Sequence, residues 1–591
     1  MESFDVIIVG AGWHGLSALR TYHHIHPTST ILLVDSSSTI GGVWAQHRLY
    51  NGLKSNNMLG TYEFSDFPMD SATYGVQPGE HIPGTVIQSY LQRFVEHFHL
   101  GEFIRLDTTV LNADHQIDGS WILTTSLSTS TSPEKTQKIK GDKLILATGL
   151  TSTPYLPPLP GDKTYPNPLI HTHDLPSHQE TLFQPNRKVT IYGATKSAWD
   201  AVYAATTSGA SVTWIIRSSG HGPCWMAPPY VTPLKRWLEK LVTTRLLTWF
   251  SPCIWGDADG YSPIRWFLHK TWIGRKIVDG FWGILEQDVV GLNGYEGNAE
   301  TRKLRPWIGP FWVASGLSIL NYPGDFFALV RSGRVRVVVD EIHSLGGDGG
   351  ITLKESGEVI ESDGLVCATG WQVTPNITFS PVGIDKELGF PWAEDCIPRV
   401  MVERADEEIL ARFPKLRDAP KREEVVPVGQ GAPATARHPF RLARFMIPPA
   451  LAKERSVAVL GVAMTINTAL VAQVQALWVA AYLGDRMALR NGERCPVDLK
   501  EMVSGKGKGE VDVDMVWETA LHSQFGVHRY PGGFGKRNPD FVFDALTYVD
   551  LLLGDLGLDC SRKKGWGVRR WLEPYGMEDY KGLVEEWMAG L

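Results

Sequence analysis

Two copies of one local pattern constrain the fold of this chain more than any other feature of its sequence. In each copy a short apolar strand ends in a glycine turn, which leads into a helix and then into a second strand. The first copy covers residues 4–35 and the second covers residues 188–217. Such β-α-β units build doubly wound sheets that bind dinucleotides. We therefore predict an α/β protein with two Rossmann-like dinucleotide-binding domains.

The first glycine turn, GAGWHG, places Gly10, Gly12 and Gly15 in the G-x-G-x-x-G register. The first glycine permits the turn, the second lets the backbone approach a pyrophosphate, and the third allows close packing of helix on strand. Asp35 ends the next strand, where a carboxylate accepts hydrogen bonds from ribose hydroxyls and repels a 2′-phosphate. The first site is therefore predicted to bind FAD or NAD and not NADP. His14, inside the turn, is expected to pack and not to catalyse.

The second glycine turn, GATKSA, keeps Gly193 but has Thr195 and Ala198 where the other two glycines would stand. Arg217 ends the following strand at the position that Asp35 occupies in the first unit. A guanidinium there can bind the 2′-phosphate of NADPH with two hydrogen bonds, whereas a solvated arginine at a strand end is the alternative. The second site is therefore predicted to bind NADPH. Further donors are expected from Lys196, Ser218 and Ser219.

Length and composition narrow the class of protein. The 591 residues are too many for one hydrophobic core, so at least two domains are expected. A formal net charge of -7 offers no electrostatic support for binding nucleic acid. The six cysteines lie far apart without a C-x-x-C pair, which argues against a metal site and against a disulfide scaffold.

Two strands that end in Ala-Thr-Gly mark the expected crossings between the domains. Proline-rich residues 151–162 follow the first and predict a stiff connection, and the second, at residues 364–371, predicts the return to the first domain. Nine of the 21 tryptophans lie between residues 225 and 312, which we interpret as a helical insertion that covers the active site. The expected parts are an FAD-binding domain at 1–160 and 361–485, an NADPH-binding domain at 161–360 with the insertion at about 222–320, and a C-terminal extension at 486–591.

Compartment and membrane contact can also be predicted. No basic, cleavable apolar segment precedes the first strand, so a cytoplasmic location is expected. Residues 456–483 carry no charge, but Asn467, Gln473 and Gln475 interrupt them, which favours a buried strand and helix over a membrane span. Residues 235–250 form an amphipathic pattern, for which an internal lid helix is favoured and a helix on a membrane surface is the alternative.

The two loops, the Ala-Thr-Gly strand ends and the residues GGVW at 41–44 resemble the class B flavin-dependent monooxygenases. These comprise flavin-containing monooxygenases, Baeyer-Villiger monooxygenases and N-hydroxylating relatives. Residues 53–69 resemble the flavin-containing monooxygenase pattern in which an asparagine precedes F-x-D-F-P, and Asn56 matches that asparagine. The resemblance implies that Asn56 contacts the flavin edge and steadies the oxygenated flavin, with Ser55 and Asn57 lining the same site. A turn residue is the alternative interpretation of Asn56.

The family fingerprint F-x-G-x-x-x-H, followed by an aromatic residue and proline, is matched only in part. Here it is represented by Tyr165, Asn167, His171 and then Leu175-Pro176. By resemblance His171 couples the positions of the domains and the geometry of NADP. The Leu-Pro ending is closer to the Baeyer-Villiger version, whereas Asn56 is closer to the flavin-containing monooxygenase version, so the subclass stays open.

Residues 457–485 resemble the last strand and helix of the family's flavin domain. A helix that starts near residues 465–468 would direct its positive end at the flavin pyrimidine. The closing segments 537–558 and 574–587 resemble extensions of fungal members that act in secondary metabolism. One face of the expected helix carries, at packing spacing, Leu470, Val474, Leu477, Trp478 and Ala481.

The resemblance implies that NADPH reduces FAD, that O2 then forms a C4a-(hydro)peroxyflavin, and that one oxygen atom enters a small organic substrate, a secondary metabolite. Baeyer-Villiger oxidation of a ketone is one alternative to heteroatom oxygenation, and an oxidase-like flavoprotein that does not oxygenate is another. A disulfide reductase is excluded because the first 223 residues contain no cysteine. The catalytic residues by this resemblance are Asn56 and His171. The expected cofactor-binding residues are Gly10, Ala11, Gly12, Trp13, His14, Gly15, Asp35, Gly42, Val43, Trp44, Ser55, Asn56, Asn57, Val110, Thr148, Gly149, Gly193, Thr195, Lys196, Ser197, Arg217, Thr369 and Gly370.

Overall fold

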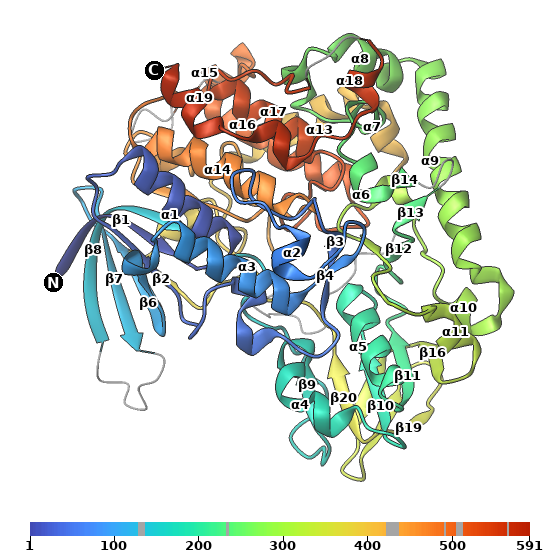
Figure 1. The fold of residues 1–591 in the computed structure, drawn as a ribbon. Coiled ribbons are helices and arrows are strands. Elements are labelled where there is room, and N and C mark those ends of the chain that lie inside the picture. The colour runs from blue at the N-terminus through green and yellow to red at the C-terminus, as the bar shows by residue number, and fades with distance from the viewer. Residues whose placement is uncertain are drawn as a thin grey trace.

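The structure is a computed structural model that describes residues 1–127, 136–231, 236–420, 436–489, 492–503, 512–563 and 567–590. One sheet lies at the left of the molecule and a second at its base, while green helices run along the right side and red C-terminal helices lie at the top (Figure 1). The predicted α/β class with two Rossmann-like units is confirmed.

The first sheet has eight strands in the order β21-β6-β7-β8-β1-β2-β5, and β22 also pairs with β8. Strands β8, β1, β2 and β5 run parallel, whereas β6 and β7 pair antiparallel. Because β21 and β22 come late in the chain, the chain returns to this sheet after it has built the second one. The strands are β1 (Glu2–Val9), β2 (Ile31–Val34), β5 (Ile104–Arg105), β6 (Thr108–His115), β7 (Trp121–Leu127), β8 (Thr136–Leu146), β21 (Thr378–Ser380) and β22 (Val457–Val459).

The second sheet is fully parallel, in the order β16-β11-β10-β20-β9. Its strand β20 (Gly364–Cys367) pairs with β10 and β9, so the chain goes back to the first sheet only after Cys367. The return expected at residue 361 is therefore too early, because β20 completes the second sheet. The other strands are β9 (Leu169–His171), β10 (Lys188–Tyr192), β11 (Ser211–Ile216) and β16 (Val335–Val339).

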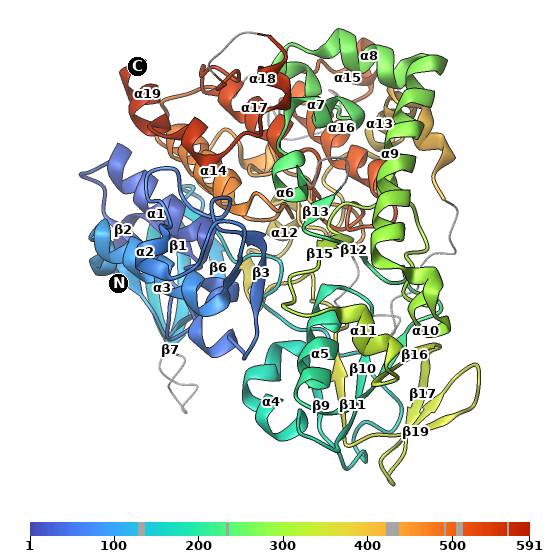
Figure 2. The same ribbon diagram turned by 45° about the vertical axis from the view of Figure 1, so that its right-hand side comes forward.

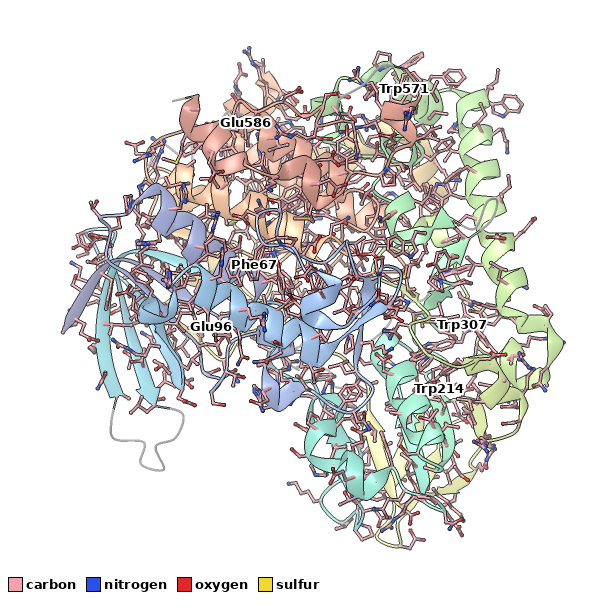
Figure 3. All side chains as sticks on the ribbon, viewed as in Figure 1. Phe67, Glu96, Trp214, Trp307, Trp571 and Glu586 are labelled. Carbon is pink, nitrogen blue, oxygen red and sulfur yellow. The ribbon has the colours of Figure 1, made fainter. Side chains whose placement is uncertain are left out.

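Apolar runs explain why the two sheets form. In β1, Val6, Ile7 and Ile8 are fully buried, as expected for a parallel strand that is covered on both faces. Helices α1 (Trp13–Ile25) and α3 (Gly84–His97) lie beside the first sheet, with Glu96 on α3 and Phe67 near it (Figure 3). Helices α4 (Leu175–Leu182), α5 (Lys196–Thr207) and α11 (Phe326–Arg331) accompany the second sheet, whose core contains Trp214 (Figure 3).

Helix α14 (Thr468–Leu483) lies in the middle of the molecule, between α1 and the C-terminal helix α17 (Ala545–Asp555) (Figure 1). The predicted packing face is confirmed, since all five of its residues are buried, and the rest of the helix from Ala469 to Leu483 is buried as well because the C-terminal extension covers its other side. The prediction that residues 456–483 form a buried strand and helix is confirmed. Among the described residues no helix combines the length and the apolarity that a bilayer crossing requires.

Two chain segments cross side by side between the sheets. Tyr155 donates its backbone N–H to the carbonyl of Gly370 at 3.0 Å, and Gln372 donates to the carbonyl of Thr153 at 2.8 Å. Pro154 and Trp371 form an isolated antiparallel bridge. The outgoing and returning connections are therefore tied to one another between the two sheets.

The segment between β11 and β16 is mostly helical, and its long helix α9 runs along the edge of the molecule (Figure 2). Residues 235–250, expected as one amphipathic helix, instead hold the short helices α6 and α7, and Lys235 lies outside the described residues. Leu238 and Leu247 are buried, so these helices face the interior. The elements are β12 (Trp225–Ala227), β13 (Tyr230–Val231), β14 (Arg236–Trp237), α6 (Leu238–Leu241), α7 (Arg245–Phe250), α8 (Ser262–Lys270), α9 (Trp272–Asn293), α10 (Ala299–Arg302) and β15 (Leu317–Ile319).

The C-terminal extension packs over α14 and reaches this insertion (Figure 2). Buried Arg245 of α7 pairs with Asp550 of α17 and, at 3.0 Å, with Asp259. Trp571, at the top of the molecule, donates its indole N–H to the Tyr261 hydroxyl at 3.0 Å (Figure 3). The extension therefore holds the insertion in place. Its other helices are α15 (Val497–Val503), α16 (Val513–Arg529), α18 (Arg569–Leu572) and α19 (Leu583–Ala589).

Smaller elements complete the fold. A three-stranded antiparallel sheet follows β16, and the short helix α12 and the longer α13 lie between β21 and β22. They are α2 (Ser71–Tyr74), β3 (Lys54–Met58), β4 (His81–Pro83), β17 (Ile342–Leu345), β18 (Gly350–Leu353), β19 (Val359–Glu361), α12 (Ile384–Glu387) and α13 (Arg399–Arg412).

Candidate functional site

The first glycine loop joins β1 to α1, and two of its glycines have no room for a side chain. Gly10 has φ +113°, and a Cβ there would lie 2.4 Å from the carbonyl oxygen of Ala147. A Cβ on Gly15 would lie 1.8 Å from the carbonyl oxygen of Gly10. Both contacts are with backbone, which cannot move aside cheaply. The start of α1 therefore lies directly against the strand ends of the first sheet.

In the middle of this loop, two backbone segments lie close together without side chains between them; we call this the Gly12–Gly42 cradle. A Cβ on Gly42 would come within 3.0 Å of the Cα of Gly12, so the two glycines bring their chains together. Helix α1 has neither a side-chain cap nor an acidic residue in its first turn, which leaves its N–H groups and its positive end open to an anion. These features fit the pyrophosphate of a dinucleotide.

Asp35 stands directly after β2, beside the loop. Its carboxylate accepts the backbone N–H of Ala11 at 2.6 Å and that of Ser37 at 2.8 Å. One bond falls on each oxygen, so each keeps lone pairs that ribose hydroxyls can use. Asp35 thus fits a ribose that lacks a 2′-phosphate.

The side chains of Trp13 and His14 are packed inside the protein. Trp13 contacts the rings of Tyr62 and Phe64 at 4.6 and 4.9 Å between centroids. His14 lies against Gly461, and burial lowers the pKa of its imidazole to about 4, so the ring is neutral. The ring of His14 thus packs beside Gly461, in line with the packing role expected for it.

The other residues expected at the first cofactor lie around the same end of the sheet. Val43 is 43% exposed, and Trp44 donates its indole N–H to the Tyr62 hydroxyl at 3.3 Å. Val110 is buried in the core that also contains Val9 and Val34. After β8 come Thr148 and then Gly149, which has φ +68° and open space where a Cβ would stand.

Strand β3 carries the three polar residues Ser55, Asn56 and Asn57, and the side chain of each donates a hydrogen bond. Ser55 donates its hydroxyl to the carbonyl of Asn57 at 2.6 Å. Asn56 donates its side-chain N–H to the Ser318 hydroxyl of β15 at 3.0 Å. Asn57 donates to the carboxylate of Glu239 and, at 2.9 Å, to the carbonyl of Ile466 just before α14. Strand β3 is therefore the place where the insertion and the start of α14 meet.

Helix α14 begins at Thr468, within the range that the sequence predicts, and its N-cap residue Asn467 makes no side-chain cap bond. Its positive end thus lies next to β3, where the resemblance places the flavin ring.

The second glycine loop joins β10 to α5. Gly193 has φ +135°, and a Cβ there would lie 2.3 Å from the carbonyl oxygen of Ala368. Thr195 is the N-cap of α5 and makes no side-chain cap bond. Ala198 is fully buried where the first loop has its third glycine. The turn is therefore kept even though two of the three glycines are absent.

Lys196 and Ser197 open helix α5. The Lys196 ammonium group pairs with Asp200 and donates to the side-chain oxygen of Asn321 at 3.0 Å. Asn321 in turn donates to the carbonyls of Lys54 and Ser55 at 3.0 and 3.1 Å. Lys196 thus ties the second unit to β3 in this structure, and Ser197 is partly exposed beside it.

Arg217 follows β11 at the end of the second sheet, matched in position to Asp35. Among the residues that the structure describes, it forms no ion pair with a carboxylate within 4.0 Å. Its neighbours Ser218 and Ser219 donate their hydroxyls to Glu355 and Glu341. A free guanidinium at this edge fits a phosphate, although the carboxylates nearby weaken the positive field.

His171 ends β9, beside Cys367 of β20 and close to the crossing of the two connections. Its ring meets that of Trp371 edge-on, with 5.0 Å between centroids, and its Nδ1 accepts the backbone N–H of His173 at 3.1 Å. Burial lowers its pKa to about 4. Thr369 donates its hydroxyl to the carbonyl of Tyr155 at 2.6 Å, and Gly370 follows with φ +87°. These residues therefore brace the crossing.

Four residues at the site were not predicted from the sequence: Glu239, Ser318, Asn321 and Asp540. Glu239 of α6 is 1% exposed, accepts hydrogen bonds from Asn57 and, at 3.1 Å, from the backbone N–H of Met58, and also contacts the Thr61 hydroxyl. Burial raises its pKa to about 7. Burial also raises the pKa of Asp540 to about 6, and Asp540 binds the backbone N–H of Ser315 at 3.0 Å. No local pattern marks these residues, because their partners are far away in the chain.

A cavity of about 270 Å³ borders Glu239 and the start of α14. We call it the extension cavity because residues 573–578 of the C-terminal extension form one of its walls. Its lining also includes Gly60, Thr61, Lys240, Thr243, Asn467, Leu470 and Lys563.

Comparison with known proteins places this arrangement in a family. The family model described as pyridine nucleotide-disulphide oxidoreductase matches residues 7–246, which include both glycine loops. The FAD-dependent monooxygenase rstn6 of Aspergillus nomiae is 32% identical, over 99% of this chain and 98% of the relative. The FAD-dependent monooxygenase DEP4 of Alternaria brassicicola is 31% identical, over 99% of this chain and 95% of the relative.

Solved structures share the fold. The closed form of cyclohexanone monooxygenase has a TM-score of 0.55 and 16% identity, covering 100% of this chain and 98% of that one. The S-allyl-L-cysteine S-oxygenase of Allium sativum has a TM-score of 0.51 and 16% identity, covering 99% of this chain and 93% of that one. Full-length similarity to curated relatives, together with the two nucleotide loops, shows that the chain belongs to the FAD-dependent monooxygenases of the class B flavin-dependent group.

Proposed function

We propose that this enzyme uses NADPH to reduce bound FAD, and O2 to place one oxygen atom in a small organic substrate. The observation that carries the proposal is the pairing of two equivalent glycine turns with opposite charges at matched strand ends. Asp35 follows the second strand of the first unit, and Arg217 follows the second strand of the second unit. One unit is thus suited to FAD and the other to a nucleotide with a 2′-phosphate.

The FAD would lie across the first loop. The Gly12–Gly42 cradle and the open start of α1 would hold its pyrophosphate, and Asp35 would bind its ribose. The ring would reach β3 and the start of α14, since these elements meet at Asn57 and Ile466. When bound, FAD supplies the redox chemistry by taking hydride from NADPH and activating O2.

The protein itself would orient the reactants and keep water out. Asn56 and Asn57 would present amide groups at the flavin edge, and the N-terminal end of α14 would stabilise negative charge on the reduced ring. We place the substrate in the extension cavity, because it borders Asn467 and Thr61 beside these elements. NADPH would bind at the second loop, with Arg217 on its 2′-phosphate.

The names of the relatives support the general activity, and three of these proteins are from fungi of the genus Aspergillus. We propose a secondary metabolite as the substrate, in line with the resemblance of the C-terminal segments to fungal enzymes of that kind. Heteroatom oxygenation and Baeyer-Villiger insertion remain the two alternatives for the bond that is made. The compared structures include a ketone monooxygenase and an S-oxygenase at similar TM-scores, so the fold does not separate them.

Purified enzyme with isotopically labelled O2 tests the proposal against a panel of sulfides, amines and ketones. We expect NADPH to be used in preference to NADH, and one labelled oxygen atom in each product. A lactone or ester identifies Baeyer-Villiger insertion, whereas an N- or S-oxide identifies heteroatom oxygenation. Hydrogen peroxide without oxygenated product from every substrate class would instead support the oxidase-like alternative.

A further inference from the structure

We propose that Glu239 is a positioning residue for oxygenation that works as a neutral carboxylic acid and holds Asn57 against the start of α14. The inference rests on the proposed function, since it assumes that the flavin edge lies at β3. Glu239 comes from the insertion, whereas Asn57 belongs to the first unit, so the interaction joins two separate parts of the chain.

The contacts of Glu239 all lead to one turn. One carboxyl oxygen meets the side chains of Asn57 and Thr61, and the other accepts the backbone N–H of Met58 at 3.1 Å. Among the described residues no cation forms an ion pair with Glu239 within 4.0 Å. Burial favours the protonated form and is the largest effect on the pKa of Glu239, whereas the hydrogen bonds that it receives and the charge of Lys240 favour the carboxylate.

Counting protons supports the same conclusion. The Thr61 hydroxyl lies 2.7 Å from the carbonyl oxygen of Met58 and also contacts Glu239. A hydroxyl has one proton, and a carbonyl can only accept, so the bond to Met58 uses that proton. The contact between Thr61 and Glu239 is then favourable only if Glu239 donates a proton of its own. Burial raises the pKa of Glu239 to about 7, which makes a neutral carboxyl available near neutral pH.

The turn that Glu239 holds lies at the inner end of the extension cavity. Glu239, Thr61 and Asn467 all line this cavity, and Asn57 reaches from the same turn to the carbonyl of Ile466. Loss of the proton would place a negative charge at the inner end and remove the donor to Thr61. We infer that Thr61 then turns its hydroxyl towards the carboxylate and gives up its bond to Met58, which shifts the turn beside Asn57. O2 would then be reduced to hydrogen peroxide with electrons from NADPH, in place of oxygenating the substrate.

The variant Glu239→Gln tests this inference, because its amide keeps both a donor and an acceptor but does not ionise near neutral pH. For the wild type we expect the ratio of product to NADPH consumed to fall as pH rises through about 7. The variant should keep that ratio nearly constant with pH and lose less than about threefold at pH 6. Glu239→Leu should raise hydrogen peroxide release about tenfold at every pH, because it leaves buried donors without a partner.

A second readout does not depend on activity. A carboxyl whose pKa is raised on folding supports stability at low pH and loses that support as pH rises from the unfolded value towards the folded one. Relative to Glu239→Gln, the wild-type Tm should therefore decline between about pH 4.5 and pH 7 and then level off. Glu403→Gln, at an exposed position of α13, is the matched control and should follow the wild type.

The two readouts separate the two claims. A Tm difference that does not change with pH overturns the inference, whatever the activity. The inference is also overturned if the ratio of product to NADPH consumed depends on pH in the same way in Glu239→Gln as in the wild type. If the Tm difference follows pH but the wild type makes no oxygenated product, the neutral acid is supported and the proposed function is the claim that fails.

Discussion

The two glycine loops share the same turn but differ in how closely the following helix packs against it. In both, the first glycine faces the carbonyl of an alanine in an Ala-Thr-Gly strand end, and a Cβ would lie 2.4 Å from it at Gly10 and 2.3 Å at Gly193. At the third position the first loop has Gly15, which cannot carry a side chain, whereas the second has Ala198, which does. Helix α1 therefore lies closer to its turn than α5 does.

This difference bears on the two ligands. The first loop offers close backbone contact on both sides, through Gly12 and Gly42, while the second begins its helix at the exposed Thr195. We infer that the first site holds its nucleotide mainly through backbone groups and the second mainly through the charge of Arg217. The following variants test that distinction, in order of decreasing expected effect.

Gly15→Ala should have the largest effect. The added Cβ would lie 1.8 Å from the carbonyl oxygen of Gly10, so α1 must move away from the sheet. We expect a loss of about 3 kcal/mol or more of unfolding free energy and loss of bound flavin. The flavin-to-protein absorbance ratio and thermal unfolding measure both. A stable variant that retains all its FAD would show that close packing of the first loop is not required.

Arg217→Ala should act on the second site alone. Loss of a charged contact with phosphate corresponds to about 1.5–3 kcal/mol, so the preference for NADPH over NADH should fall by roughly tenfold or more. Rates with NADH and the flavin content should stay the same. Arg331→Ala, another arginine of the second unit that is exposed on α11, serves as the control. An unchanged ratio of kcat/KM for the two nucleotides would exclude Arg217 as the phosphate ligand.

Asn56→Leu probes the place where the two units meet. Leucine has a similar size but cannot donate to Ser318, so we expect flavin reduction by NADPH under anaerobic conditions to remain near normal. The yield of product per NADPH should fall about tenfold, with hydrogen peroxide released in its place. Ser318→Ala removes only the partner and should have a smaller effect. Wild-type coupling in the Asn56 variant would make Asn56 a turn residue.

Ala198→Gly should have the smallest effect, and it tests the third position of the second loop. It restores the glycine pattern at the second loop but places glycine in a helix, at a cost of up to about 1 kcal/mol. We expect a slightly lower Tm and nearly unchanged NADPH use. A gain in NADPH affinity of tenfold or more would mean that Ala198 holds α5 too far from its ligand.

Local patterns were enough to predict the parts of the site that form within one β-α-β unit. The turns at Gly10 and Gly193, the strand end at Asp35 and the start of α14 depend on neighbouring residues, and the structure has them where the sequence predicts. The bond between Asn56 and Ser318 joins residues 262 positions apart, and that between Asn57 and Glu239 spans 182. Such partners cannot be identified from a local pattern.

Two features of the fold were not predicted, for the same reason. The sequence predicts one packing face of α14, which is buried as expected, but α1 and α17 enclose the helix from both sides. The return to the first sheet was expected at residue 361, but β20 still belongs to the second sheet. In both cases the outcome depends on which distant segment covers an apolar surface, and an apolar residue has the same appearance in the sequence whichever segment covers it.

The paired crossing between the sheets also decides how the molecule would respond to mechanical force. Tyr155 and Gly370 are bonded backbone to backbone, so the whole second sheet lies on a loop that is closed at its base. Tension applied between the first and last described residues would pass through the first sheet and across this bond. The second sheet would carry the full load only after this bond, the neighbouring bond between Gln372 and Thr153, and the ties between the insertion and the C-terminal extension had broken. Under force, the part of the chain assigned to NADPH is thus shielded by the part assigned to FAD.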